Sequence, residues 1–142
     1  MLGQQPERPL LTGGLEARRL RQWHVDLIRA ARVRRMYFSY DQPSELEPLF
    51  AAGKLLRDGG ISRASHRAAC YVLIGYVADT FEAAEKRLRD TWAAGFMPYA
   101  MLYRDDTGQT DPAWRVFQRE WIRPQLVWGK LRSADRQGVT IL

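Results

Sequence analysis

Short apolar runs alternate with segments whose apolar residues recur at helical spacing, and this alternation extends through most of the chain. The apolar runs predict strands at residues 10–12, 36–40, 70–76 and 97–103. The segments after them predict helices at residues 15–31, 43–57, 79–95 and from about 112 to Pro124. Strands that alternate with helices are typical of a parallel sheet with right-handed crossovers. The sequence therefore predicts an α/β fold.

The four consecutive β-α units set the expected size of the sheet. Four units are half of a (β/α)8 barrel, so we expect half of a TIM-like partial barrel, with an open doubly wound sheet as the alternative. We assign these units to one domain at residues 10–124. An N-terminal tail at 1–9 and a C-terminal tail at 125–142 flank the domain and show no pattern that predicts structure.

The first predicted helix is amphipathic. On a helical wheel its apolar face carries Leu20, His24, Leu27 and Ala31, with Trp23 and Ile28 beside it. The opposite face carries Arg18, Arg21, Arg29 and Arg32. This pattern predicts that Trp23 and His24 are packed inside and that the arginines form a solvated outer surface.

Polar and small residues follow the predicted strands, at the edge where parallel α/β proteins form their ligand sites. They are Glu16, Ser39, Tyr40, Asp41, Gly75, Tyr76, Asp79, Tyr103, Arg104 and Asp105. Many such residues only end strands and start helices. Asp79, with Glu82 three residues later, has the spacing of a capping box at the start of the third helix.

Composition narrows the class of protein. Hydrophobic residues make up 46% and charged residues 27% of the 142 residues, which is typical of a globular chain. We find no apolar run long enough to span a membrane and no signal peptide.

A single cysteine, Cys70, excludes an internal disulfide and suits a reducing cytoplasm, where we expect this protein. The net charge of +6 suits anionic partners and leaves nucleic acid open as one of them.

Several blocks of the sequence, in order over residues 10–124, resemble one protein family. The blocks are LLTGGLEARRL, MYFSYDQPSELEPLFAAGKLLRDGGI, CYVLIGYVADTFEAAEKRL, GFMPYAMLYRD and WRVFQREWIRP. Together they are similar to the C-terminal half of the barrel in radical S-adenosylmethionine (radical SAM) proteins, in particular the bacterial and phage iron–sulfur oxidoreductase-like branch.

The resemblance implies a fold, two cofactors and a set of site residues. Family members form a partial (β/α) barrel, hold a [4Fe-4S] cluster through a CxxxCxxC loop, and cleave S-adenosylmethionine to a 5′-deoxyadenosyl radical. By this resemblance, Ser39 and Asp41 match positions that contact the ribose and methionine of the cofactor. Ile74, Gly75 and Tyr76 match the strand that approaches adenine. Glu16, in the segment GGLE, is similar to a residue that meets the cofactor's amino group.

The chain departs from the family at the cluster. It contains no CxxxCxxC, and one cysteine cannot supply three thiolates, so we assign no metal ligand. We interpret Cys70 as a buried structural thiol. The sequence thus predicts a truncated or split radical SAM-type protein, inactive alone, whose partner is a cluster-bearing N-terminal half or a second copy bound through open sheet edges. The alternative is a non-catalytic basic binding or assembly module that associates with nucleic acid.

Overall fold

The computed structural model describes residues 10–62, 65 and 67–136, with the backbone alone at 10–14 and 133–136. The predicted tail at 1–9 and the last residues, 137–142, lie outside this part of the chain. The strands are β1 (Leu10–Leu15), β2 (Arg35–Tyr40), β3 (Ala68–Ile74) and β4 (Met97–Leu102). The helices are α1 (Gln22–Ala30), α2 (Leu46–Asp58), α3 (Phe81–Ala93), α4 (Pro112–Arg119) and α5 (Pro124–Arg136), with short 3₁₀ turns η2 (Ala17–Arg19) and η3 (Pro43–Glu45). The prediction of an α/β fold is confirmed.

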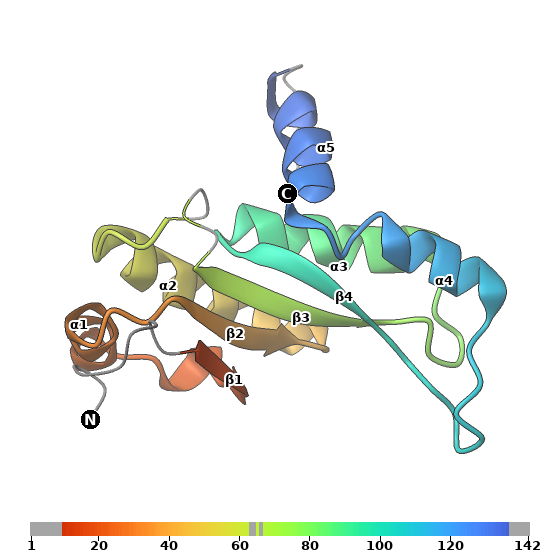
Figure 1. The fold of residues 1–142 in the computed structure, drawn as a ribbon, viewed down its shortest axis with the longest axis horizontal. Coiled ribbons are helices and arrows are strands. Elements are labelled where there is room, and N and C mark those ends of the chain that lie inside the picture. The colour runs from red at the N-terminus through yellow and green to blue at the C-terminus, as the bar shows by residue number, and fades with distance from the viewer. Residues whose placement is uncertain (1–9, 63–64, 66, 137–142) are drawn as a thin grey trace.

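The strands form one parallel sheet in the order β1-β2-β3-β4 (Figure 1). Phe38 pairs with Cys70, and Tyr71 pairs with Tyr99, and the pairings of β2 with β3 and of β3 with β4 run in continuous register. The order increases uniformly along the described strands. A doubly wound sheet instead reverses direction at a switch point. The pairing of β1 with β2 shifts between Leu11 and Leu15.

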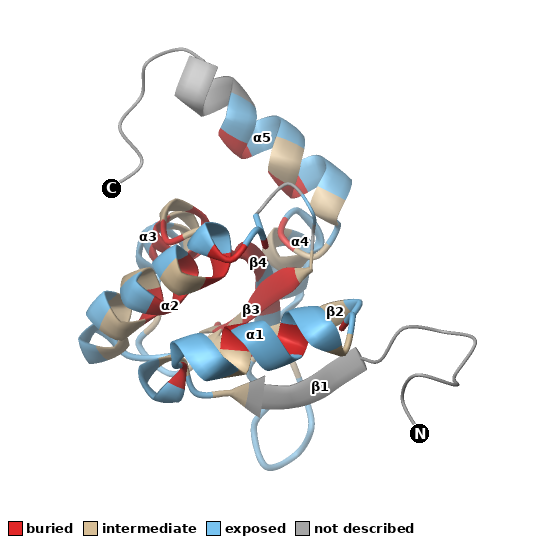
Figure 2. Cartoon of the chain, turned by 90° about the vertical axis from the view of Figure 1, so that its left-hand side faces the viewer, coloured by how far each residue is buried: buried red, intermediate tan, exposed pale blue. Residues whose placement is uncertain are grey.

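One face of the sheet is covered by helices. Its buried side chains include Met36, Phe38 and Tyr40 of β2, and Cys70, Val72 and Ile74 of β3. Buried residues of α1 and α2 pack with the β2 set, and Ala84, Leu88 and Trp92 of α3 pack with Val72 and Ile74. In Figure 1, α2 and α3 lie behind the sheet, and in Figure 2 the buried positions of β3 and the helices meet in the middle of the molecule. The core therefore lies between the sheet and these helices.

The other face of the sheet is partly open. Tyr37 stacks on Tyr71 with ring centroids 4.7 Å apart, and Tyr71 contacts Tyr99 edge to face at 5.5 Å. These rings come from three neighbouring strands and form a continuous row, which we call the tyrosine row. Tyr99 is 37% exposed and Met101 is 42% exposed. Toward the carboxyl ends of β3 and β4, aromatic and apolar side chains thus face solvent.

The orientation predicted for the first helix is wrong. Val25 and Ile28 are its buried residues, whereas Trp23 is 62% exposed and Leu27 is 61% exposed. The helix begins at Gln22, after a separate 3₁₀ turn, so Leu20 lies outside it and does not share its periodicity. When Leu20 is left out of the helical wheel, the buried face of the helix lies toward Val25. Trp23 then points away from the core.

The prediction of a C-terminal tail without pattern is also wrong for residues 124–136, which form α5. Pro124 begins this helix and does not end the previous one, which stops at Arg119. Proline is favoured in a first helical turn, where its missing N–H has no partner to lose. Val127 and Leu131, one turn apart, are fully buried in the same cluster as the core residues of α3. None of the helices within the described residues is long and apolar enough to cross a membrane.

The outer edge of β4 is bonded to the segment after α4. The Ala100 amide of β4 donates to the Trp121 carbonyl at 3.2 Å, and the Ala100 carbonyl accepts from Gln118 Nε2 at 3.1 Å. Pro98, two residues earlier, has no N–H to offer. The edge of β4 is therefore closed at Ala100 by the segment after α4.

Cys70 is fully buried and forms no disulfide, which confirms its interpretation as a structural thiol. Burial raises the pKa of this thiol well above its usual value, and the charges of Asp41 and Glu45 add to the effect. Because the thiolate is the reactive form, we expect no labelling by Ellman's reagent in native protein at pH 8 and full labelling in urea. Rapid stoichiometric labelling without denaturant would contradict the observed packing.

Candidate functional site

A polar cavity of about 340 Å³ lies where β1 and β2 end. Its lining residues are Glu16, Ala17, Arg18, Ser39, Glu45 and Pro48. Glu16 follows β1, Ser39 is the penultimate residue of β2, and Glu45 comes from η3. Two residues predicted for the site from separate segments, Glu16 and Ser39, are thus brought together. The structure adds Arg18 and Glu45, which sequence reasoning missed.

Two acidic residues, Glu16 and Glu45, and one basic residue, Arg18, line the cavity. Glu16 Oε2 is 3.0 Å from Arg19 Nε, in an ion pair whose two side chains are largely exposed. Glu45 Oε2 accepts the backbone amide of Asp41 at 2.7 Å and that of Gln42 at 3.3 Å. These bonds hold the Glu45 carboxylate at the end of β2, because a carboxylate that accepts two amides has little freedom to move. The cavity can therefore take a group that is cationic on one side and anionic on the other.

Asp41, predicted for the site, stands directly after β2 but is not one of the residues that line this cavity. Burial of its carboxyl group raises its pKa, and the neighbouring charge of Glu45 raises it further. Two carboxylates near each other disfavour full ionisation of both. The Asp41 carboxyl group therefore ionises less readily than an ordinary aspartate.

The predicted residues Ile74, Gly75 and Tyr76 do not line the polar cavity. Ile74 is fully buried in the core between sheet and helices. A Cβ on Gly75 would lie 2.9 Å from Leu102 and 3.1 Å from Trp114, and its φ of +76° also requires glycine. The ring of Tyr76 faces the guanidinium of Arg87, 5.2 Å from its carbon. Contacts within the protein account for this segment.

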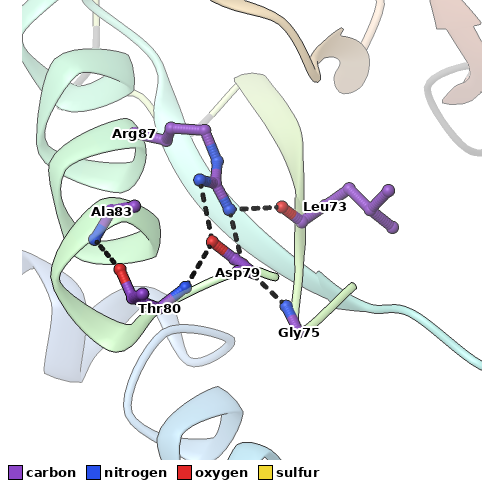
Figure 3. Close-up of polar contacts among 6 residues, drawn as sticks. All are labelled: Leu73, Gly75, Asp79, Thr80, Ala83 and Arg87. Carbon is purple, nitrogen blue, oxygen red and sulfur yellow. Dashed lines mark hydrogen bonds and ion pairs between the residues drawn. The ribbon is translucent and has the colours of Figure 1, made fainter. Parts of the chain in front are cut away.

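A buried ion pair fixes the turn after β3 (Figure 3). The Asp79 side chain is fully buried and accepts four bonds, from Gly75 N at 2.8 Å, Thr80 N at 2.9 Å, and Arg87 Nη1 and Nη2 at 3.1 and 2.8 Å. Arg87 Nη2 also donates to the Leu73 carbonyl at 3.0 Å. The pair ties the end of β3 to the middle of α3.

Asp79 is therefore not the N-cap that the spacing predicts. Thr80 caps α3, with its hydroxyl accepting from the Ala83 amide at 3.1 Å. The prediction fails because the Asp79 carboxylate is occupied by the turn and by Arg87. One signal in the sequence pointed to Arg87: it falls between Ala84 and Leu88 on the inward side of the third helix.

A second cavity, of about 390 Å³ and largely apolar, lies on the other side of Glu16. Its lining residues are Leu15, Glu16, Arg19, Leu20, His24, Leu27, Ile28 and Phe38. It is formed mainly by α1 and the turn before it. This second cavity was not predicted from the sequence, because the helical wheel of the first predicted helix placed Leu27 inside the core.

The residues present do not fit an iron–sulfur cluster. Within residues 10–62, 65 and 67–136, no group of three or more His, Cys, Asp or Glu side chains could hold a metal ion, and Cys70 is buried alone in the core. Comparison with protein-family models, with curated proteins and with solved structures finds no match to this chain.

Proposed function

We propose that this chain is one part of a radical SAM-type protein, a half of a TIM-like barrel that binds the amino acid end of S-adenosylmethionine in the polar cavity. The observation that carries the proposal is the convergence of Glu16, Arg18, Ser39 and Glu45 around one cavity at the carboxyl ends of two parallel strands. Ligand sites in parallel α/β folds form at this end of the sheet.

The chemistry of the cavity suits an α-amino acid group. An ammonium prefers carboxylate neighbours such as Glu16 and Glu45, and a carboxylate prefers a guanidinium such as Arg18. The Ser39 hydroxyl can donate or accept, so it can bond either end. The excess of carboxylates also suits the positive sulfonium of S-adenosylmethionine. Only the amino acid end of the cofactor is supported in this way, because the segment at 74–76 does not line the cavity.

The arrangement of the sheet supports the barrel part of the proposal. The strand order increases without reversal, and helices pack on one face, as in a segment of a (β/α) barrel. The tyrosine row would then lie on the inner face of the barrel. Since the cluster does not fit this chain, reductive cleavage of the cofactor would need a second, cluster-bearing chain. The residues of this chain would bind and orient the cofactor.

Equilibrium dialysis or calorimetry with S-adenosylmethionine tests the proposal. We expect Glu16→Gln and Ser39→Ala each to weaken binding about tenfold, as loss of a charged hydrogen bond does. Glu82→Gln, an exposed acid in the first turn of α3, is the matched control and should leave binding unchanged. 5′-Methylthioadenosine, which lacks the amino acid, should not compete. Absence of binding at millimolar cofactor, or equal competition by methylthioadenosine, would overturn the assignment.

A further inference from the structure

The outer surface of α1 carries two large apolar side chains that the core does not use. Trp23 and Leu27, one turn apart, are each more than half exposed, at 62% and 61%. They lie on the side of the helix away from Val25 and Ile28, which are buried. Tryptophan is the largest apolar side chain and is well buried on average, so the exposure of Trp23 is unusual.

The Trp23 ring is held in place by its neighbour. The indole stacks on the His24 imidazole with ring centroids 3.7 Å apart and an angle of 27° between the planes. His24 Nδ1 accepts the Arg21 backbone amide at 2.9 Å, which fixes the imidazole at the start of the helix. An exposed aromatic ring with a fixed orientation loses little freedom on binding a flat partner.

The net charge of the protein is concentrated in the stretch of sequence that contains Trp23. Residues 16–35 contain seven arginines and two carboxylates, a net charge of +5 out of +6 for the whole chain. The arginines are Arg18, Arg19, Arg21, Arg29, Arg32, Arg34 and Arg35. Both carboxylates are engaged locally, Glu16 with Arg19 and Asp26 with Gln22 Nε2. We call residues 16–35 the arginine segment.

We propose that the arginine segment binds single-stranded nucleic acid, with a base stacked on Trp23 and phosphates bound by arginines of the same segment. The concentrated positive charge selects a polyanion, and it opposes a second copy, which would bring the same +5 to the contact. Stacking on an exposed aromatic ring beside basic side chains is how proteins bind single strands without sequence preference. Trp23, Arg29 and Arg32, the residues changed in the tests below, are not among those that line the polar cavity, so this activity can be measured apart from cofactor binding there.

Fluorescence anisotropy with fluorescein-labelled dT20 and rU20 tests the proposal on the full chain. We expect binding that weakens between 50 and 200 mM salt, and a 20-base-pair duplex that binds more weakly than the single strand. Trp23→Leu should weaken binding roughly tenfold with no change in the salt dependence, and Trp23→Phe should retain most of the affinity. Because Trp23 is exposed, circular dichroism should show both variants folded.

Arginine variants test the phosphate contacts separately. Arg29→Gln and Arg32→Gln should each lower the slope of log K against log salt by about 0.7. Arg104→Gln, an exposed arginine after β4, is the matched control and should leave the slope unchanged.

Three results would overturn the proposal: no binding at 50 mM salt, equal binding of duplex and single strand, or an affinity that Trp23→Leu leaves unchanged. Poly-glutamate that binds as tightly as dT20, with the same dependence on Trp23, would also overturn it and assign the surface to an acidic protein.

Discussion

Replacing Asp79 with asparagine is expected to lower the free energy of unfolding by about 3–5 kcal/mol, because the change leaves a buried guanidinium without its counter-charge. Asparagine keeps the shape of the side chain but offers one acceptor oxygen where Asp79 accepts four donors. Its NH₂ group would also face donors from Thr80 and Arg87. Arg87 is only 10% exposed, so water cannot replace the lost bonds.

Urea unfolding followed by tryptophan fluorescence measures this effect. The control is the same substitution at Asp58, which pairs with Lys54 at 2.8 Å on the surface of α2, where both side chains are more than half exposed. Asp58→Asn should leave stability almost unchanged. Adding Arg87→Met to Asp79→Asn should restore part of the loss, because it removes the unpaired charge. Equal effects of the two aspartate variants would contradict the buried ion pair.

The second large effect is expected at Gly53, in the middle of α2. Alanine is favoured over glycine in a helix by about 1 kcal/mol. Here, however, a Cβ would lie 1.8 Å from the Ala94 carbonyl oxygen and 3.3 Å from the Phe96 ring. Because the nearest atom belongs to the backbone, the two segments must separate. We expect Gly53→Ala to destabilise the protein by about 1–3 kcal/mol or more, as overpacking does.

The same substitution at Gly129 supplies the control. Gly129 lies in α5, is exposed, and would bring its new Cβ within 4 Å of nothing. Gly129→Ala should therefore raise stability by about 0.5–1 kcal/mol through helix propensity alone. We therefore predict that the same substitution in two helices changes the free energy of unfolding in opposite directions when both are measured in the same denaturation assay. Stabilisation by both would show that α2 and the Ala94 turn do not approach each other closely.

Much of the sheet could be predicted from the sequence, because a strand buried between layers is a local apolar run. The run at 70–76 and the aromatic run at 36–40 both mark strands whose observed bounds differ from the predicted ones by at most two residues. The meeting of Glu16 and Ser39 followed from the same reasoning, since parallel strands end at one edge. The local hydrophobic pattern and the parallel topology were sufficient to predict these strands and the meeting of Glu16 and Ser39.

The missed features depend on contacts between distant segments or on where a helix starts. The bond from Arg87 to Asp79 joins the middle of a helix to a turn, and spacing alone assigned Asp79 to a cap. The exposure of Trp23 depends on the first residue of α1, and a shift in that residue rotates the whole face. In α5, Val127 and Leu131 carried a helical signal, but Pro124 was taken as a stop.

The closure of the β4 edge has a consequence during synthesis of the protein. Ala100 precedes the residues that cap it, Gln118 and Trp121, along the chain, so it emerges from the ribosome before they do. At 5–20 residues per second, the strand waits on the order of one to four seconds with an unpaired edge. During that interval the nascent chain presents an apolar strand to its neighbours, and the segment after α4 acts as its built-in protection against aggregation.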